Sequence, residues 1–444
     1  MIMPGNARGE GTRKRHTACA LLLAIMNSVG SALAGEYTFD ASEFARKPYE
    51  LGGYVEYRHD RFWLNQNGAF YGLAFQGRGA PSSLTRNAAT LKLEGNYRHG
   101  AASVRARTHL EYDHEDGSSE RVTRFDELAG SWKPGPDLTV ELGKIALKWG
   151  KGYAWNPIAF VERLKDPNDP ELAREGFWMA TADWVRTFDG PLKTIAFTPV
   201  LLPTGKDVNS EFGRTGHTNV AARLYLLWHD TDIDFVYLSG GSRPSRVGVD
   251  FSRNITTSLE VHGEWARVSD AQRRTITAEG QPRVVHGKAD SYLLGMRYLT
   301  AKDTTFIAEY YRNGAGYTES EMEDFFVFTG NALLQQHTTP ADELVRRANV
   351  AAQSGYARAQ PMQRYFYLRV SQKDPFDFLY WTPAVTSIVN LADRSFSISP
   401  EIAYTGFTNV ELRLRLFALG GGDRTDFGEK LNKRRVELRA RLYF

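Results

Sequence analysis

Arginine recurs at every second position in several segments, which is the spacing of side chains on one face of a β-strand. Arg413 and Arg415 show this spacing, and so do Arg439 and Arg441 near the C-terminus. A guanidinium can hold a carboxylate, phosphate or sulfate through two parallel hydrogen bonds, so such a face could bind anions. Glu411 would share the face of Arg413. A network of mutually neutralising charges is therefore the alternative.

A second group of cations belongs to the Gly- and Pro-containing segment 149–177, together with the residue just before it. These cations could line a constriction inside a pore, and the alternative is an external surface loop. The group consists of Lys148, Lys151, Arg163, Lys165 and Arg174.

Other chemistry is weakly indicated. Segment 166–171 offers carboxylates that could hold Ca²⁺, but it lacks the glycine and the ligand spacing of a calcium loop, so turn formation is the preferred interpretation. No nucleophile motif accompanies the serines, and His109 and His262 are expected in hydrogen-bond networks. We expect no catalytic residue, no metal and no cofactor.

The elements that would position these charges are β-strands. In the C-terminal segment one face is apolar and the other is charged, and the same alternation recurs along the chain. The apolar face there consists of Val436, Leu438, Ala440, Leu442 and Phe444. About eighteen strands are predicted, and sixteen remain possible because 193–202 and 377–390 contain Pro199 and Pro383. The predicted strands are 51–63, 86–98, 102–112, 124–133, 138–148, 178–187, 193–202, 218–228, 232–239, 245–252, 255–267, 290–299, 304–312, 363–372, 377–390, 395–405, 409–419 and 434–444.

The predicted connections alternate between short polar turns and long segments. This rhythm is typical of outer-membrane barrels, with short periplasmic turns and long extracellular loops, and an even strand number places both ends on the periplasmic side. The long connections are expected near 65–82, 113–123, 149–177, 203–217, 268–289, 313–362 and 420–433.

The first 34 residues indicate an export signal. A basic stretch precedes an apolar run that is too short to span a membrane, and Ala32-Leu33-Ala34 resembles a cleavage site. This segment holds the only cysteine, Cys19, so a disulfide framework is excluded. It also holds four of the 55 Lys and Arg and one of the 52 Asp and Glu. The remaining chain is close to neutral, which argues against nucleic-acid binding.

The sequence therefore predicts an all-β, antiparallel transmembrane β-barrel over 35–444. A soluble β-sandwich would also show alternation, but an export signal, alternating loop lengths and terminal Phe444 favour the barrel. The 21 Tyr, 9 Trp and 25 Phe suit aromatic girdles at two membrane interfaces.

Three motifs resemble those of known barrels. Arg439–Phe444 resembles the terminal assembly signal of outer-membrane proteins, and the chain as a whole resembles the porin-type family. Segment 143–157, with Lys148-Trp149-Gly150-Lys151-Gly152 and Trp155-Asn156-Pro157, is similar to uncharacterised proteobacterial porin-like proteins and, more loosely, to alginate-export-type barrels. Asn390–Ser395 followed by Pro400-Glu401 is similar to their penultimate hairpins. The resemblance implies a barrel in an outer membrane and specifies no substrate.

In a barrel the charged face must line the lumen, because a charge at the lipid midplane costs about 2–4 kcal/mol. One wall would be basic, and the opposite wall more acidic. The predicted basic wall consists of Arg58, Lys92, Arg98, Arg105, Arg107, Arg413, Arg415, Arg435, Arg439 and Arg441, with Glu56, Glu94, Glu111, Glu411 and Glu437 between them. The predicted acidic wall consists of Glu141, Asp234, Glu260, Glu264 and Glu309, with Arg223, Arg297 and Arg369.

Segment 313–362 is too long for a featureless loop. Thr339-Pro340 indicates a helix start and Gly355 its end, and the segment could plug the lumen or cap its mouth. The function expected is an outer-membrane channel of a Gram-negative bacterium for passive diffusion of small hydrophilic, possibly anionic, solutes. The alternatives are a sheath for a secreted polymer or a periplasmic redox partner and, less favoured, a barrel hydrolase.

Overall fold

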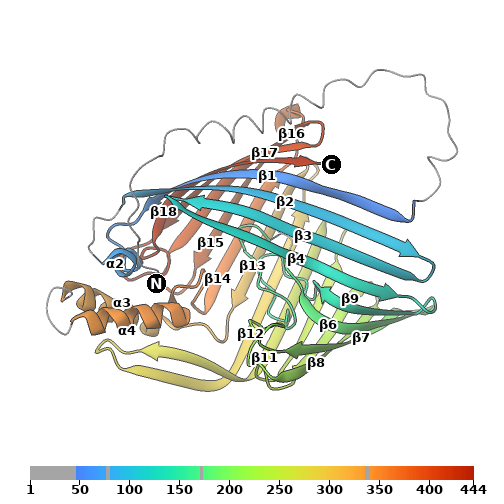
Figure 1. The fold of residues 1–444 in the computed structure, drawn as a ribbon, viewed down its shortest axis with the longest axis horizontal. Coiled ribbons are helices and arrows are strands. Elements are labelled where there is room, and N and C mark those ends of the chain that lie inside the picture. Colours follow the sequence, from blue (N-terminus) through green and yellow to red (C-terminus); the bar gives the residue numbers. More distant parts are fainter. Residues whose placement is uncertain (1–46, 77–80, 171–173, 336–340) are drawn as a thin grey trace. The chain divides into compact units, whose positions relative to one another are not determined.

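The computed structural model describes residues 47–76, 81–170, 174–335 and 341–444. Eighteen antiparallel strands form one sheet in these residues, and the sheet closes because the first strand pairs with both the second and the last (Figure 1). The prediction of a closed barrel with eighteen strands is confirmed, and the sixteen-strand alternative is wrong. The predicted signal segment 1–34 lies outside the described residues.

The strands are β1 Tyr49–Leu64, β2 Ser83–His99, β3 Ala102–Glu115, β4 Ser118–Trp132, β5 Leu138–Ile145, β6 Phe177–Thr187, β7 Leu192–Thr204, β8 His217–Trp228, β9 Thr231–Ser239, β10 Arg246–Asn254, β11 Leu259–Ile276, β12 Pro282–Leu299, β13 Thr304–Arg312, β14 Arg364–Gln372, β15 Trp381–Asn390, β16 Phe396–Phe407, β17 Val410–Gly420 and β18 Asn432–Tyr443. The helical elements are α2 Ala69–Phe75, α3 Glu319–Leu334, α4 Ala341–Ala351, the π-helical turn η2 Ala352–Tyr356 and the 3-10 turn η3 Pro375–Asp377. None of the described helices is long and apolar enough to cross a membrane.

The alternating apolar and charged side chains of the strands lie on opposite faces of the barrel wall. In β18 the side chain of Leu438 is 49% exposed, whereas Glu437 is 1% and Arg439 is 7% exposed. The apolar side chains therefore face outward, and the charged ones face the lumen, where water and opposite charges can satisfy them. The wall closes at β1 and β18, where Gly53 and Phe444 exchange backbone hydrogen bonds of 3.0 and 3.1 Å.

Two of the predicted long loops are wrong. Residues 113–123 belong to a tight hairpin in which Asp116 and Gly117, both with positive φ, join β3 to β4. Most of 268–289 extends β11 and β12, which continue past a bulge between Val268 and Ala271. Both segments lack alternating apolar residues. A hairpin that projects beyond the barrel wall still keeps its backbone hydrogen bonds, and it needs no apolar face because it does not contact lipid.

The remaining connections follow the predicted rhythm. We call the edge where adjacent strands are joined by short turns the short-turn edge. The other is the long-connection edge, where residues 65–82, 146–176, 205–216, 313–363 and 421–431 join the strands. Helices α2, α3 and α4 gather at the long-connection edge, beside the extended β11–β12 hairpin (Figure 1).

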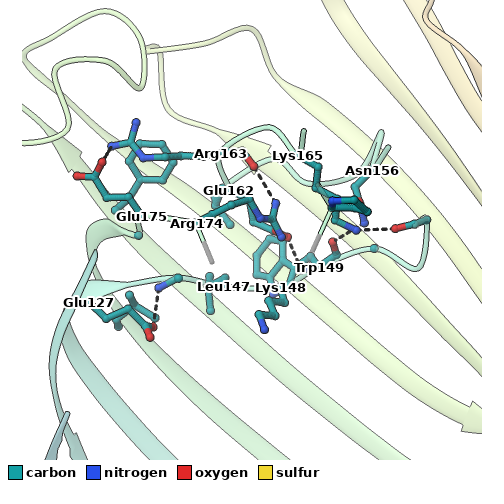
Figure 2. A pocket seen from close by; sticks show the side chains of 18 of the residues that line it. Glu127, Leu147, Lys148, Trp149, Asn156, Glu162, Arg163, Lys165, Arg174 and Glu175 are labelled. Atoms are coloured by element: carbon teal, nitrogen blue, oxygen red, sulfur yellow. Dashed lines mark hydrogen bonds and ion pairs between the residues drawn. The ribbon is translucent and has the colours of Figure 1, made fainter. Parts of the chain in front are cut away.

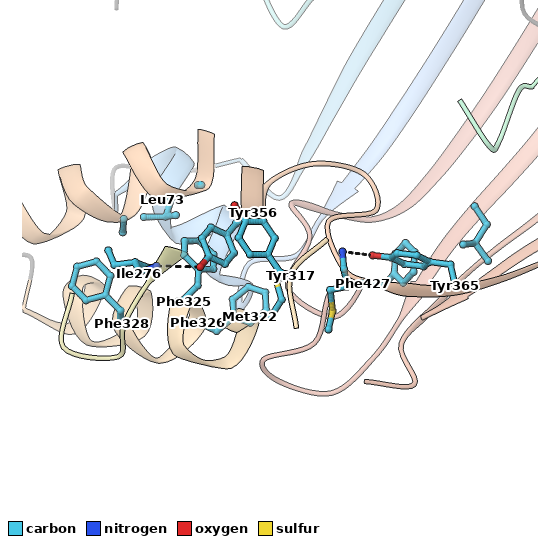
Figure 3. Packing of buried hydrophobic residues seen from close by; sticks show 14 of the residues in the cluster. Leu73, Ile276, Tyr317, Met322, Phe325, Phe326, Phe328, Tyr356, Tyr365 and Phe427 are labelled. Atoms are coloured by element: carbon cyan, nitrogen blue, oxygen red, sulfur yellow. Dashed lines mark hydrogen bonds between the residues drawn. The ribbon is translucent and has the colours of Figure 1, made fainter. Parts of the chain in front are cut away.

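The helices are held by an aromatic core that we call the cap cluster. The ring of Phe325 in α3 stacks on Tyr356 at a centroid distance of 4.3 Å, and Tyr356 stacks on Tyr317 at 3.9 Å (Figure 3). Ile276, at the tip of β11, donates its backbone N–H to the Tyr356 hydroxyl at 3.2 Å. A capping box between Thr318 and Glu321 starts α3. The cap cluster is therefore packed against the β11–β12 hairpin, which the sequence did not predict.

We expect Phe325→Ala to loosen the packing of the cap cluster without opening the barrel. Phe325 is fully buried, and removing such a ring costs about 3–5 kcal/mol of local packing. Amides of α3 and α4 should then exchange hydrogen much faster, while those of β1 and β18 keep their protection. Leu334→Ala is the matched control, because Leu334 lies in the same helix and is 84% exposed. Equal exchange in both variants would contradict the packing described here.

Candidate functional site

Within the connection 146–176, the described residues 146–170 and 174–176 fold against the inner face of the barrel, and we call this connection the lumen loop. Its turn is bound by Glu264 of β11, which accepts backbone N–H bonds from Lys151 at 2.7 Å and Gly152 at 2.6 Å. The second oxygen of Glu264 accepts the N–H of Ile158 at 3.3 Å. A carboxylate thus replaces the backbone partners that this irregular segment lacks.

Glu309 of β13 binds the next part of the lumen loop. It accepts the backbone N–H of Ala154 at 2.8 Å and that of Tyr153. His262 of β11, two strands away in the sheet, holds this carboxylate, with 2.9 Å between Nε2 and Oε1. Glu264 and Glu309, which the sequence placed on an acidic lumen wall, therefore anchor the lumen loop.

The other end of the lumen loop reaches the opposite wall. Asp169 lies 3.1 Å from a guanidinium nitrogen of Arg439 in β18. Burial acts to raise the pKa of Asp169, but Arg439, Arg415 and Arg413 together lower it below its ordinary value. The lumen loop therefore spans from β11 and β13 to the β17–β18 wall, and it divides the lumen.

Apolar packing fixes the underside of the lumen loop. Trp149, Ile158 and Phe160 are buried against inward-facing residues of β6 to β11, including Leu202 and Leu238. Gly150 has a φ of +88°, and a side chain there would collide with Asn156 and Glu264. The close approach of backbone to carboxylate thus requires glycine at this position.

A cavity of about 520 Å³ lies between the lumen loop and the wall of β2, β3 and β4 (Figure 2). Lys151 pairs with Asp234 at 3.1 Å and Lys165 donates to the carbonyl of Gly152 at 2.6 Å. Of the other predicted constriction residues, Arg163 pairs with Glu211 at 2.6 Å and with Glu175 at 3.3 Å, and Arg174 pairs with Glu162 at 2.9 Å.

Lys148 differs from these cations. Its side chain is exposed in the cavity, and among the described residues it has neither a hydrogen bond nor an ion pair (Figure 2). A positive charge that no carboxylate neutralises remains available to a solute.

The predicted basic wall lies on five neighbouring strands, β17, β18, β1, β2 and β3. Its members are paired with carboxylates except Arg98, which is exposed and has no side-chain partner among the described residues. The pairs are Arg58–Asp60, Lys92–Asp126, Arg105–Glu141, Arg107–Glu94, Arg413–Glu411, Arg415–Glu401, Arg435–Asp60, Arg439–Glu437 and Arg441–Glu56. The wall therefore has the paired charges of a network, with little free positive charge.

Most of the remaining predicted positions are explained by neighbouring residues, whereas Arg297 is exposed and has no side-chain partner among the described residues. Asp166 closes an Asx turn by accepting the N–H of Asn168 at 2.9 Å, and in the described residues no cluster of ligands could hold a metal. His109 lies 3.0 Å from Glu111, in a lumen network. Of the predicted acidic wall, Glu260 accepts a hydrogen bond from Ser252, and Arg369 pairs with Glu401 at 2.6 Å.

Sequence reasoning missed the anchoring role of Glu264 and Glu309 and the apolar underside of the lumen loop. One signal was available. Strand β7 carries apolar residues on both faces, because Val200 and Leu202 are buried inside while Leu201 is 51% exposed outside. An apolar lumen face in part of a barrel indicates that something packs on it.

Eighteen antiparallel strands, an outward apolar face and a folded loop within the lumen define an outer-membrane porin-type β-barrel, and the chain has this fold. Among solved structures, the chain is similar to OccK5 (OpdH) of Pseudomonas aeruginosa, with a TM-score of 0.50 and 12% identity over 89% of this chain and 98% of that one. It is also similar to OccK7 (OpdD) of the same organism, with a TM-score of 0.50 and 11% identity over 89% and 99%. A mutant of the Rhodopseudomonas blastica porin aligns with a TM-score of 0.45 and 9% identity over 89% and 100%.

No protein-family model matches the chain, and no curated protein matches it in sequence. At identities of 11–12% the similarity to the two OccK structures shows the fold alone.

We expect Glu264→Gln to release the lumen loop. The glutamine carbonyl can accept from Lys151 and Gly152, but its NH₂ group would then meet the N–H donor of Ile158. The substitution also removes the charge of the acceptor, and hydrogen bonds to a charged acceptor are worth about 1.5–3 kcal/mol. Hydrogen exchange at the amides of 151–154 should speed up about tenfold or more. Glu260→Gln is the control, because Glu260 lies on the same face of β11 but bonds to Ser252. Unchanged exchange in Glu264→Gln would show that apolar packing alone holds the loop.

The lumen loop should also respond to pH through Glu162. Burial raises the pKa of this carboxyl from 4.5 to about 7, although Arg174 opposes the shift, and the Trp149 backbone N–H donates to it. A carboxyl that binds its proton more tightly when folded stabilises the fold below its unfolded pKa, and this contribution is lost as pH rises through the folded pKa. The loop should therefore lose stability between about pH 5 and pH 8.

The Trp149 backbone amide resonance in a ¹⁵N NMR titration tests this response. A midpoint near 7 is expected in the native chain, and no titration in Glu162→Gln. A midpoint near the ordinary value of 4.5, or a titration that persists in the variant, would contradict the assignment to Glu162.

Proposed function

We propose that the protein is a passive, selective channel in the outer membrane of a Gram-negative bacterium, for small hydrophilic solutes that carry a negative charge. The observation that carries the proposal is the lumen loop, which is anchored on both walls and leaves Lys148 unpaired in a cavity. Because the loop is held on both walls, it narrows the lumen to a passage of fixed shape. Low-dielectric walls around this passage strengthen the electric field of an unpaired cation.

The charge balance around the cavity supports this polarity. Six cations line it, namely Arg107, Lys148, Lys151, Arg163, Lys165 and Arg174, against four carboxylates, Glu94, Glu127, Glu162 and Glu175. Lys165 donates only to backbone carbonyls, so its charge is not cancelled by a direct ion pair. The selectivity would thus come from the lumen loop, and the paired wall of β17 to β3 would stiffen the barrel.

The helical segment 313–362 would act as a cap. Its helices pack at the long-connection edge, and beneath them a second cavity of about 550 Å³ is lined by α2, the end of α4, the lumen loop and β17–β18. Phe417, Lys430 and Arg435 line this cavity. We propose that solutes pass through it from the outer mouth toward the lumen loop.

The lumen loop favours a channel over the sheath alternative. A polymer or redox partner would need an unobstructed lumen, whereas Asp169 and Arg439 connect the loop to the wall opposite Glu264. We infer no covalent chemistry for the site, whose histidines His109 and His262 are engaged by Glu111 and Glu309.

We expect Lys148→Glu to lower the ratio of anion to cation permeability by at least about twofold, because it replaces an unpaired cation in the cavity by an anion. The reversal potential of the purified barrel in a planar bilayer across a salt gradient measures this ratio. Lys302→Glu, in an exposed turn at the short-turn edge, is the control. Arg413→Glu should act less than Lys148→Glu, since Glu411 already pairs with Arg413 at 2.7 Å.

A stable conductance without anion preference in the native protein would overturn the proposed polarity. Absence of any conductance would overturn the channel itself and return the sheath to consideration, with deletion of 313–362 as the next variant.

A further inference from the structure

Two arginines stand directly opposite each other on the outer face of the barrel. Arg312 is the last residue of β13 and Arg364 the first of β14, and the two are partners in the strand register. Both share the outward parity of Tyr310 and Phe366, while on the lumen side Tyr365 is buried and Tyr311 is partly buried. The pair therefore lies on the membrane-facing side, at the long-connection edge.

Like charges directly across a ladder are destabilising. Both arginines are exposed, and neither has a side-chain hydrogen bond or ion pair within the part of the chain that the structure describes. The carboxylate of Asp290 lies diagonal to Arg312 on β12, but Arg267 engages it through two hydrogen bonds of 2.8 and 3.0 Å. Asp290 is close enough to attract Arg312, but within the described residues neither arginine has a carboxylate in direct contact.

Aromatic rings mark the depth of this pair. The register places Tyr292 beside Arg312, and the guanidinium lies over the Tyr292 ring at 5.9 Å. Tyrosine and tryptophan concentrate where the hydrocarbon meets the headgroups, and the cost of an outward charge falls to about 0–1 kcal/mol there. The arginines therefore lie at headgroup level, where anionic groups are found.

The arrangement recurs elsewhere at the long-connection edge. Arg61 of β1 lies over Trp63 at 5.5 Å, and Arg121 of β4 lies over Tyr112 at 5.7 Å. Both arginines are exposed and unpaired with any described carboxylate. At the short-turn edge, the outward Arg186 and Arg253 have no such ring among the described residues. Outward arginines beside aromatic rings, which could hold anions at headgroup level, are therefore a feature of the long-connection edge.

We propose that Arg312 and Arg364 form a binding site for a phosphate group of an outer-leaflet lipid, and that Arg61 and Arg121 provide further contacts of the same kind. Guanidinium groups bind phosphate oxygens bidentately, and two of them facing one another match a doubly charged group. The site rests on the proposed orientation in an outer membrane, with the long-connection edge outward. It would fix the depth of the barrel and support the wall from which segment 313–363 begins.

Native mass spectrometry of the purified barrel in detergent tests the site, with diphosphoryl lipid A and its fully dephosphorylated form as probes. The native protein should bind the phosphorylated probe, and the double variant Arg312→Gln with Arg364→Gln should bind it about tenfold more weakly. Arg61→Gln with Arg121→Gln should weaken binding less. Arg186→Gln with Arg253→Gln removes the same charge from the other edge and should bind as the native protein does.

Equal affinity in the Arg312/Arg364 variant and in the Arg186/Arg253 control would overturn the proposal, and so would equal binding of the two probes by the native protein. The lipid assay needs no ion flow, so its failure is distinguishable from failure of the channel. Bilayer conductance of the same variants provides the separate readout, and it should be unchanged because none of the four substituted arginines at the long-connection edge lines the lumen loop cavity.

Discussion

The structure depends on one constraint, which is that a backbone in hydrocarbon must satisfy its N–H and C=O groups within the protein. Eighteen strands meet this constraint only because β1 pairs with β18 as well as with β2. The closing ladder runs from Tyr54 opposite Tyr443 to Leu64 opposite Asn432. Closure gives every strand an inner and an outer face. The alternating charged and apolar side chains of each strand therefore line the lumen and the outer surface, respectively.

The lumen creates a second problem, because an irregular segment inside it exposes backbone donors of its own. The lumen loop solves this with Glu264 and Glu309, which accept its amides, while Trp149 and Phe160 bury apolar surface on the wall. The oxygens of these carboxylates are thereby occupied by the backbone N–H groups of the lumen loop. Charges with partners build the scaffold, whereas Lys148, like Arg98, is exposed without a partner among the described residues, and we propose Lys148 for recognition.

The strand pattern was predictable because its signal is local. Alternation of apolar and polar residues over about ten positions is visible in the sequence. Even the two doubtful predicted strands, which contain Pro199 and Pro383, are present as β7 and β15. The failures at 113–123 and 268–289 have a physical cause. Apolar alternation reports contact with lipid, whereas hydrogen bonding in a hairpin beyond the membrane leaves no such trace.

The sequence by itself determined the class of fold, the even number of strands and which residues face the lumen, because these follow from a period of two and from the cost of charge in lipid. Only the tertiary structure decided which charges remain free. Arg439 and Lys148 are equivalent in sequence as cations in a barrel, yet Arg439 is held by Glu437 and Asp169 and Lys148 is exposed in a cavity. Asp169 is distant from Arg439 along the chain, and only the folding of the lumen loop inside the closed barrel brings the two together.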